Sequence, residues 1–231
     1  FIVDMFERVY FGRREANATL TPACHHPRVT NADGRAPRRI GIIGAGVGGI
    51  CTGVQLLERG VDSFTIFERA PGVGGTWFHN TYPGLACDIP SALYSFSFEP
   101  KSDWSRPYGT QAEIRAYLEH CVDTYGLTPH LRLGTGVTSA EWRDDTTVWR
   151  VTTEGPEPGA TGEHEFDMLV AGVGMFGDLH IPDLPGLDEF TGTMFHSARW
   201  NHDHDLGGER VAVIGSAGSA VQFVPEIAPR V

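Results

Sequence analysis

The chain has 231 residues, enough to bury a hydrophobic core, and its net charge of −11 argues against a nucleic-acid partner. Apolar residues make up 41% and charged residues 20%, as in ordinary globular domains, while 29 glycines exceed the usual share. No apolar run reaches the length of a membrane span, and no signal-peptide pattern opens the chain. Four scattered cysteines form no C-x-x-C pair, so we expect a reduced, cytoplasmic protein.

Residues 1–37 mix charge, proline and alanine without a sustained period, so we expect an N-terminal extension with one short helix over 2–11. The Cys24-His25-His26 cluster has no further partners at metal-ligand spacing, and we interpret it as incidental. The chain begins with Phe1 rather than Met and ends within a helical pattern, so we expect the N-terminal fragment of a longer protein. The sequence does not determine an oligomeric state.

The next segment predicts a βαβ unit. A short β-branched strand covers 40–43, and a helical pattern with Ile50, Val54 and Leu57 follows and ends at Gly60, a typical C-terminal glycine. A second strand covers 63–70. The two strands should lie parallel, joined by a right-handed crossover.

A dinucleotide fingerprint lies between this strand and this helix. The stretch 44–49 reads G-A-G-V-G-G, which fits the G-x-G-x-x-G pattern that brings a pyrophosphate to a helix N-terminus. Glu68 ends the second strand, where a carboxylate can accept hydrogen bonds from ribose hydroxyls, so FAD or NAD is favoured over a 2′-phosphorylated nucleotide. The glycines and aromatic residues of 74–77 and 82–84 favour FAD, whose flat rings need close backbone and aromatic surface.

Further along, Thr110 and Glu113 form a capping box before an amphipathic helix. Three strand-like runs follow at 136–143, 147–154 and 163–174, the last expected to be a buried strand. We interpret Trp142 and Trp149 in this predicted β-meander as core aromatics. After a Pro/Gly-rich stretch at 181–187, residues 209–224 read as a second strand, glycine turn and helix.

A last motif occupies the stretch before this second unit. Its members follow the spacing F-x-G-x-x-x-H-x-x-x-W and are Phe190, Gly192, His196 and Trp200. With Gly74-Gly75-x-Trp77, Tyr82-Pro83-Gly84 and Asp88, it resembles the motifs of the Baeyer–Villiger monooxygenases, within the flavin-containing monooxygenases. The resemblance covers residue 38 to the end of the chain.

The resemblance implies an α/β fold with four parts. These are an N-terminal extension (1–37), a Rossmann-type FAD-binding domain with a parallel sheet and a β-meander insertion (38–185), a linker carrying the motif (186–207), and the start of a Rossmann-type NADPH-binding domain (208–231). In such enzymes NADPH reduces FAD, and a C4a-peroxyflavin formed with O2 inserts oxygen next to a ketone carbonyl to give an ester or lactone. We expect the fragment alone to be inactive, because the family's active-site arginine should lie beyond Val231.

The resemblance also implies the site residues. For the ADP half of FAD they are Gly44, Gly46, Gly49 and Glu68. For the rest of the cofactor they are Gly75, Thr76, Trp77, Asp88, Tyr94 and Val137, with Asp88 as the candidate catalytic residue or a plain loop acid. For NADPH they are Gly215, Ser216, Gly218, Ser219 and Ala220. Ala217 replaces the middle glycine, and its methyl group would crowd a pyrophosphate that Gly218 could still let approach.

Several alternatives remain open at this stage. We expect His196 to anchor a loop or couple domains rather than act as a general base, and 201–205 (NHDHD) to be a solvated turn rather than a metal site. Oxidation of N or S centres competes with ketone oxidation, and an inactive FAD-binding fragment competes with both. A disulfide reductase is disfavoured because the chain has no redox cysteine pair.

Overall fold

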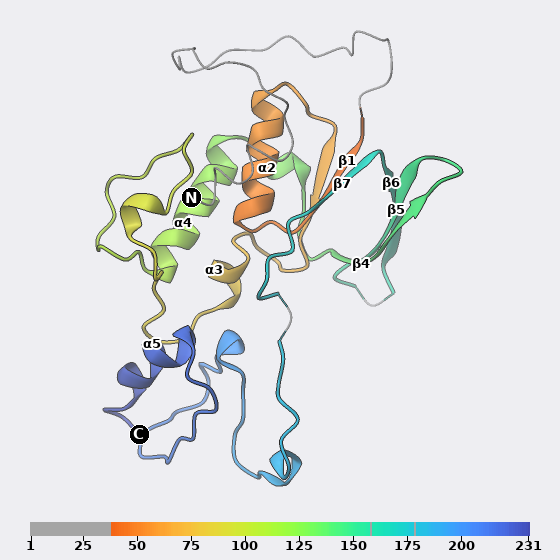
Figure 1. The fold of residues 1–231 in the computed structure, drawn as a ribbon. Helices are drawn as coiled ribbons and strands as arrows, with labels where there is room; N and C mark the ends of the chain where they lie inside the picture. Colours follow the sequence, from red (N-terminus) through yellow and green to blue (C-terminus); the bar gives the residue numbers. More distant parts are fainter. Residues whose placement is uncertain (1–37, 158, 178) are drawn as a thin grey trace.

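A four-stranded parallel sheet forms the centre of the fold (Figure 1). The computed structural model describes residues 38–157, 159–177 and 179–231, so the predicted helix over 2–11 and the Cys24–His26 cluster lie outside it. The strand order is β3-β2-β1-β7, and every neighbouring pair is parallel. The strands are β1 (Ile40–Ile43), β2 (Phe64–Phe67), β3 (Leu131–Arg132) and β7 (Met168–Ala171).

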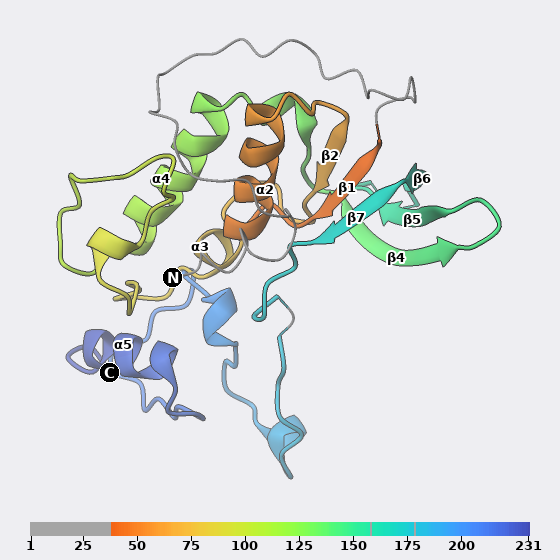
Figure 2. The ribbon, with the colours of Figure 1, turned by 45° about the horizontal axis from the view of Figure 1, so that its top comes forward.

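Two long helices cover one face of this sheet, as Figures 1 and 2 show. They are α2 (Val47–Glu58) and α4 (Gln111–Thr124). The predicted C-terminal glycine is confirmed, because Gly60 has a φ of +73° and its N–H donates to the Leu57 carbonyl at 2.9 Å. The predicted capping box is also confirmed, with Thr110 and Glu113 bonding each other's backbone N–H groups.

The main core lies between the sheet and these helices. Its most deeply buried members are β-branched and leucine side chains that the strand and helix periods place on facing surfaces. Ile42, Ile50, Val54, Ile66, Ile114 and Leu118 are each at most 1% exposed. Burial of six such side chains stabilises the fold by roughly 1.5–3 kcal/mol each, which fixes the turn between β1 and α2 in place.

The predicted β-meander is present as an antiparallel sheet in the order β4-β5-β6, on the side of the parallel sheet away from α2 (Figure 2). Its strands are β4 (Gly136–Arg143), β5 (Val148–Glu154) and β6 (Thr161–Phe166). The prediction of core tryptophans is wrong for Trp142, which is 41% exposed and donates its indole N–H to Asp144 at 2.8 Å. The reason is that β4 is an edge strand with no buried residue.

The run 163–174 divides between the two sheets rather than forming one strand. Asp167 separates β6 from β7, and both its backbone N–H and its carboxylate bond the backbone of Arg39 beside β1. This contact turns the chain from the antiparallel sheet into the parallel one. β7 is half-buried rather than buried, because it is an edge strand of the parallel sheet.

The C-terminal part of the chain contains α5 (Gly218–Ile227). It lies beyond the same end of the parallel sheet as α3 (Thr76–His79), as Figure 1 shows. Short 3₁₀ turns occupy Ser91–Leu93, Thr128–His130, Leu187–Glu189 and Ser197–Arg199. The predicted strand at 209–214 is wrong, because no described strand runs beside it to complete a ladder. No helix in the described part of the chain combines the length and apolarity that a membrane crossing needs.

Candidate cofactor-binding site

The turn between β1 and α2 requires glycine at its first and last fingerprint positions. Gly44 has a φ of +97°, in the left-handed region that favours glycine, and a Cβ there would lie 2.5 Å from the Gly172 carbonyl oxygen. A Cβ on Gly49 would lie 1.8 Å from the Gly44 carbonyl oxygen. These two glycines therefore fix the turn and the close packing of helix on strand, as in dinucleotide-binding fingerprints.

The middle glycine leaves the turn open on one side. Gly46 precedes α2 without a side-chain cap, and the first turn of the helix contains no acidic residue. A Cβ on Gly46 would meet only the backbone of Gly75, whose Cα lies 3.6 Å away. The 74–75 loop is held against the turn by the Gly74 N–H, which donates to the Ala45 carbonyl at 2.9 Å. The free N–H groups in the first turn of α2 and the helix dipole thus lie beside two closely packed glycines, an arrangement that suits an anion.

Glu68 lies directly beside this turn. It follows β2, is 6% exposed, and accepts hydrogen bonds from the Ala45 N–H at 2.9 Å and the Ala70 N–H at 2.8 Å, one on each carboxylate oxygen. Each oxygen keeps a further lone pair for a hydroxyl donor. The glycine turn and this carboxylate fit a pyrophosphate and its neighbouring ribose; the individual contacts stay predictions.

The residues predicted along the flavin divide between the core and the surface. Trp77 is 7% exposed, and its indole N–H donates to the Tyr94 hydroxyl at 3.0 Å with the rings edge to face. Thr76 and Asp88 are exposed. Val137 is half-buried in β4 and packs against the small cluster around Phe67 at the end of β2. Trp77 and Tyr94 therefore form one rigid pair, whereas Thr76 and Asp88 are free to meet a ligand.

The negative charge of Asp88 acts on three neighbouring titratable groups. Burial is the main cause that raises the pKa of Tyr82, Cys87 and Tyr94, and the carboxylate of Asp88 adds to each of these rises. These groups stay neutral near pH 7 because all three pKa values move upward. Asp88 is thus an exposed carboxyl group beside three uncharged side chains, Tyr82, Cys87 and Tyr94.

The second glycine turn repeats the backbone of the first. Gly215 has a φ of +115°, and Ala217 caps α5 with φ −78° and ψ −176°, close to the −82° and −166° of Gly46. Ala217 therefore occupies the middle fingerprint position, in extended backbone that any residue adopts. A Cβ at Gly218 would meet nothing within 4 Å, so the start of α5 is open there. This turn therefore has the backbone of the first turn, with one methyl group at its middle fingerprint position.

Of the motif residues at 190–200, the tryptophan packs onto α5 and the histidine caps a local turn. Trp200 contacts Phe223 of α5 and Phe195, with ring centroids 5.1 and 5.2 Å apart. The His196 Nδ1 accepts a hydrogen bond from the Ala198 N–H at 3.1 Å and so caps a 3₁₀ turn. Phe190 is 61% exposed. The anchoring role expected for His196 agrees with this geometry.

The sequence did not predict two of the contacts in this region. Tyr82 packs on Phe223 with ring centroids 6.1 Å apart, and its hydroxyl donates to Gln222 at 3.1 Å. Tyr82 belongs to the Tyr-Pro-Gly motif seen in the sequence, but a single sequence does not show that its partner is Gln222, 140 residues away. Nothing in the sequence singles out Gln222. Both residues join the 81–88 segment to α5.

The 201–205 stretch is a turn, as predicted. The His202 ring bonds the Thr81 hydroxyl at 2.8 Å, and the His204 ring bonds Glu209 at 3.0 Å. The turn borders a cavity of about 300 Å³ that also reaches Arg230. Across the described ranges, no three potential metal-ligating side chains come together. The turn's histidines therefore serve as loop contacts.

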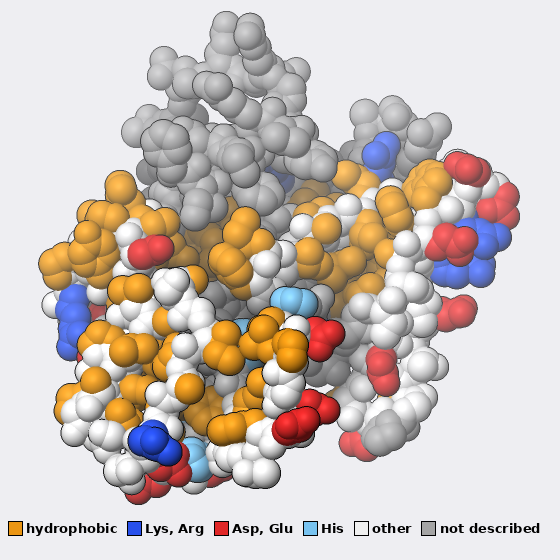
Figure 3. Space-filling view, turned by 60° about the horizontal axis from the view of Figure 1, so that its bottom comes forward, with side chains coloured by type: hydrophobic (Ala, Val, Ile, Leu, Met, Phe, Trp, Pro, Cys, Tyr) orange, Lys and Arg blue, Asp and Glu red, His pale blue; other side chains and the backbone are white. Residues whose placement is uncertain are grey.

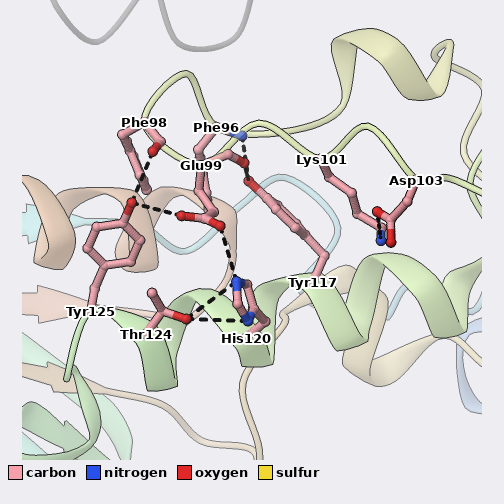
Figure 4. Close-up of polar contacts among 9 residues, drawn as sticks. All are labelled: Phe96, Phe98, Glu99, Lys101, Asp103, Tyr117, His120, Thr124 and Tyr125. Atoms are coloured by element: carbon pink, nitrogen blue, oxygen red, sulfur yellow. Dashed lines mark hydrogen bonds and ion pairs between the residues drawn. The ribbon is translucent and has the colours of Figure 1, made fainter. Parts of the chain in front are cut away.

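A separate polar cluster fastens the 96–103 loop to α4 (Figure 4). The Glu99 carboxylate meets His120 at 3.1 Å and accepts from the Tyr125 hydroxyl at 3.0 Å. The Tyr117 hydroxyl donates to the Glu99 carbonyl at 2.8 Å, and burial raises the pKa of this phenol. These polar groups are hydrogen-bonded to one another, so we interpret the cluster as structural.

Apolar side chains gather on the face that carries α5 (Figure 3). The exposed members on and before this helix are Val211, Val213, Ile214, Val221 and Val224. Their exposure agrees with the missing strand at 209–214, since a strand in a sheet would bury alternate side chains.

The fold is α/β with two glycine turns of the kind found in dinucleotide-binding proteins, and one family model identifies the class further. The model described as "Flavin-binding monooxygenase-like" matches residues 37–230, so the chain belongs to this family. A Baeyer–Villiger monooxygenase of Streptomyces coelicolor is 48% identical over 193 residues, which cover 84% of this chain and 36% of that protein. An FAD-binding monooxygenase of Aspergillus terreus is 40% identical, and the match covers 83% of this chain and 34% of that protein.

Solved structures give the same result. Cyclohexanone monooxygenase from Rhodococcus sp. Phi1 bound to NADP+ is 39% identical with a TM-score of 0.74, over 84% of this chain and 36% of that one. A cyclohexanone-bound structure of cyclohexanone monooxygenase is 39% identical with a TM-score of 0.73, over 84% and 37%. The chain therefore spans about a third of the relatives that it matches. The predicted fold class and family are confirmed.

Proposed function

We propose that residues 38–185 are the FAD-binding part of a Baeyer–Villiger monooxygenase, that 186–207 are the linker, and that 208–231 begin the NADPH-binding part. The complete enzyme would convert a ketone, O2, NADPH and a proton to an ester or lactone, NADP+ and water. Bound FAD supplies the electron transfer from NADPH and the activation of O2. The C4a-peroxyflavin and the cytoplasmic location stay predictions.

The chain's own residues bind and orient in this proposal. The N-terminus of α2 would hold the FAD pyrophosphate beside Gly46, and Glu68 would accept hydrogen bonds from the ribose hydroxyls. Trp77 and Tyr94 would give the flavin a rigid aromatic neighbour, and the exposed Asp88 would be the acidic residue near it. The N-terminus of α5 holds the NADPH pyrophosphate.

One observation carries the proposal: Gly46 and Gly75 face each other across the start of α2, with the Glu68 carboxylate at the side of the same turn. A helix start with free N–H groups and with no side chain on either of these two glycines suits a pyrophosphate. The 48% identity to a Baeyer–Villiger monooxygenase supports a ketone as the substrate, and the NADP+-bound neighbour supports NADPH as the reductant.

The test uses the complete reading frame that contains this chain. The purified protein should be yellow, and NADPH should bleach its flavin. NADPH oxidation should rise when cyclohexanone is added, with ε-caprolactone as the product identified by gas chromatography. Sulfoxide from methyl phenyl sulfide, with no lactone from any ketone, would move the assignment to the oxidation of N or S centres.

A flavin that NADPH cannot bleach would support the remaining alternative, an FAD-binding protein without turnover. Ala217 is the observation that favours it, because its methyl group lies where the first turn has Gly46. Colourless protein that takes up no added FAD would contradict both proposals.

A further inference from the structure

We propose that Gln222 is a positioning residue that ties the backbone just before Asp88 to α5, so that a nucleotide at the start of α5 restrains the Asp88 loop. The proposal rests on the proposed function, because it assigns the N-terminus of α5 to NADPH. Asp88 and α5 belong to the two different glycine-turn units, and Gln222 spans the 136 residues between Ala86 and itself with direct hydrogen bonds.

The backbone around Ala86 has one edge paired and one edge free for a partner. Ala86 forms an isolated antiparallel bridge with Thr110, the cap of α4. In this bridge the Cys87 N–H donates to the Gly109 carbonyl at 2.9 Å, and a matching bond lies on the other side of the bridge. The N–H and C=O of Ala86 itself therefore point to the opposite edge, because pairing alternates along an extended chain.

The Gln222 amide occupies that opposite edge like one residue of a neighbouring strand. Its Nε2 donates to the Ala86 carbonyl at 2.8 Å, and its Oε1 lies 3.5 Å from the Ala86 nitrogen. The Tyr82 hydroxyl donates to the same Oε1 at 3.1 Å and so fixes the orientation of the amide. A side chain of α5 thus completes the backbone hydrogen bonding of the residue two positions before Asp88.

The neighbouring chain is shaped for this close approach. Gly84 has a φ of +75°, and a Cβ there would lie 2.7 Å from the Glu226 Cγ and 3.0 Å from the Gln222 carbonyl oxygen. Beside it, Tyr82 and Phe223 are each 7% exposed and pack together. The segment before Asp88 therefore rests directly on α5, and movement of the helix would move the segment.

The same contacts lead back to the second glycine turn. Ala220, in the first turn of α5, packs against the cluster of Tyr82, Phe223 and Ile227. The proposed function places a pyrophosphate at this first turn. A continuous path runs from this first turn of α5 through Tyr82 and Gln222 to Ala86. This path couples the two ends only if nucleotide binding at the start of α5 changes the backbone at Ala86, which can be measured directly.

The test measures amide hydrogen exchange at Ala86 in the complete reading frame that contains this chain, with FAD bound. Gln222→Leu keeps the bulk of the side chain and removes its hydrogen bonds. Without NADP+, the variant should exchange the Ala86 amide about tenfold faster than the native protein. NADP+ should slow this exchange in the native protein and have no effect on it in Gln222→Leu. A merely structural role would raise the exchange rate but would keep the response to NADP+.

The matched control is Gln55→Leu, because Gln55 lies in α2 and its bonds among the described residues go to Glu58 and Arg59 at the end of its own helix. This variant should keep both the native exchange rate at Ala86 and its response to NADP+. If Gln222→Leu does not fold, Gln222→Glu retains the acceptor for Tyr82 and loses the donor to Ala86, and the same loss of response is expected. An NADP+ response that survives in either Gln222 variant overturns the proposal while the proposed function stands. If calorimetry detects no NADP+ binding to the native protein, the proposed function fails and the proposal fails with it.

Discussion

The carboxylate of Glu68 accepts the backbone N–H of Ala45 at 2.9 Å, across 23 residues of chain. This bond joins the end of β2 to the glycine turn after β1 and buries the carboxylate almost completely. The residue that is proposed to bind the ribose of FAD therefore also holds the turn in shape before any ligand arrives. Loss of its charge should affect both folding and binding.

Glu68→Gln should destabilise the protein by about 1–3 kcal/mol, because the amide NH₂ would face the N–H donor of Ala45 or Ala70 and leave it unsatisfied. Urea unfolding measures this loss, and the FAD content of the purified protein should fall in parallel. The control is Glu58→Gln, since Glu58 is exposed on α2. Unchanged stability of Glu68→Gln would contradict the bonding seen at this turn.

The two adjacent glycines of α2 should respond in opposite ways to alanine. Gly49→Ala places a Cβ 1.8 Å from the Gly44 carbonyl oxygen and should cost more than about 3 kcal/mol, because α2 must move off β1. A Cβ on Gly48 meets nothing within 4 Å, so Gly48→Ala should be neutral or stabilise by up to about 1 kcal/mol. Thermal unfolding of both variants measures the two changes in stability, and equal changes would contradict the turn geometry.

The capping box of α4 should make stability depend on pH. The Ser105 N–H donates to Glu113 at 2.9 Å and is the main cause that lowers the pKa of this carboxyl to about 2. A carboxyl with a lowered pKa contributes stability that is fully present above its ordinary value of 4.5 and is lost as pH falls towards 2. The stability gap between the native protein and Glu113→Gln should therefore be larger at pH 7 than at pH 3.

Urea unfolding at the two pH values measures that gap. Glu119→Gln serves as the control, because Glu119 forms a half-exposed i,i+4 pair with Arg115 that should contribute only about 0.3–0.5 kcal/mol. Thr110→Ala, which removes the other half of the box, should cost about 1 kcal/mol at pH 7. A gap for Glu113→Gln that is constant from pH 7 to pH 3 would contradict the bonding to Ser105.

Local patterns predicted the parts of the fold that depend on neighbours in the sequence. The strand at 40–43, the helix ending at Gly60 and the capping box of Thr110 each depend on spacing within one element, and the structure has them as expected. The predicted strand at 209–214 failed because a strand depends on a partner, and no described strand pairs with it. The prediction for Trp142 failed because a period-two pattern does not tell whether a strand lies at an edge with neither face buried, as β4 does.

The candidate site divides in the same way. Glu68 and the fingerprint glycines were found because their spacing follows from one βαβ unit. Gln222 was missed because its function comes from a contact between two units that lie 136 residues apart in the sequence. Its chemistry, one primary amide satisfying one peptide group, leaves no pattern in neighbouring residues.

Ala217→Gly should improve the use of NADPH. Ala217 lies in extended backbone like Gly46, so the methyl group causes no strain in the chain and its removal should cost at most about 1 kcal/mol of stability. If the methyl group crowds the pyrophosphate, its loss should lower the KM for NADPH about two- to tenfold without changing FAD content, a gain of up to about 1.4 kcal/mol. The reciprocal variant, Gly46→Ala, should lower FAD retention and leave the KM for NADPH of the remaining flavin-loaded protein unchanged. An unchanged KM in Ala217→Gly would mean that the start of α5, open at Gly218, already accommodates the nucleotide beside the methyl group.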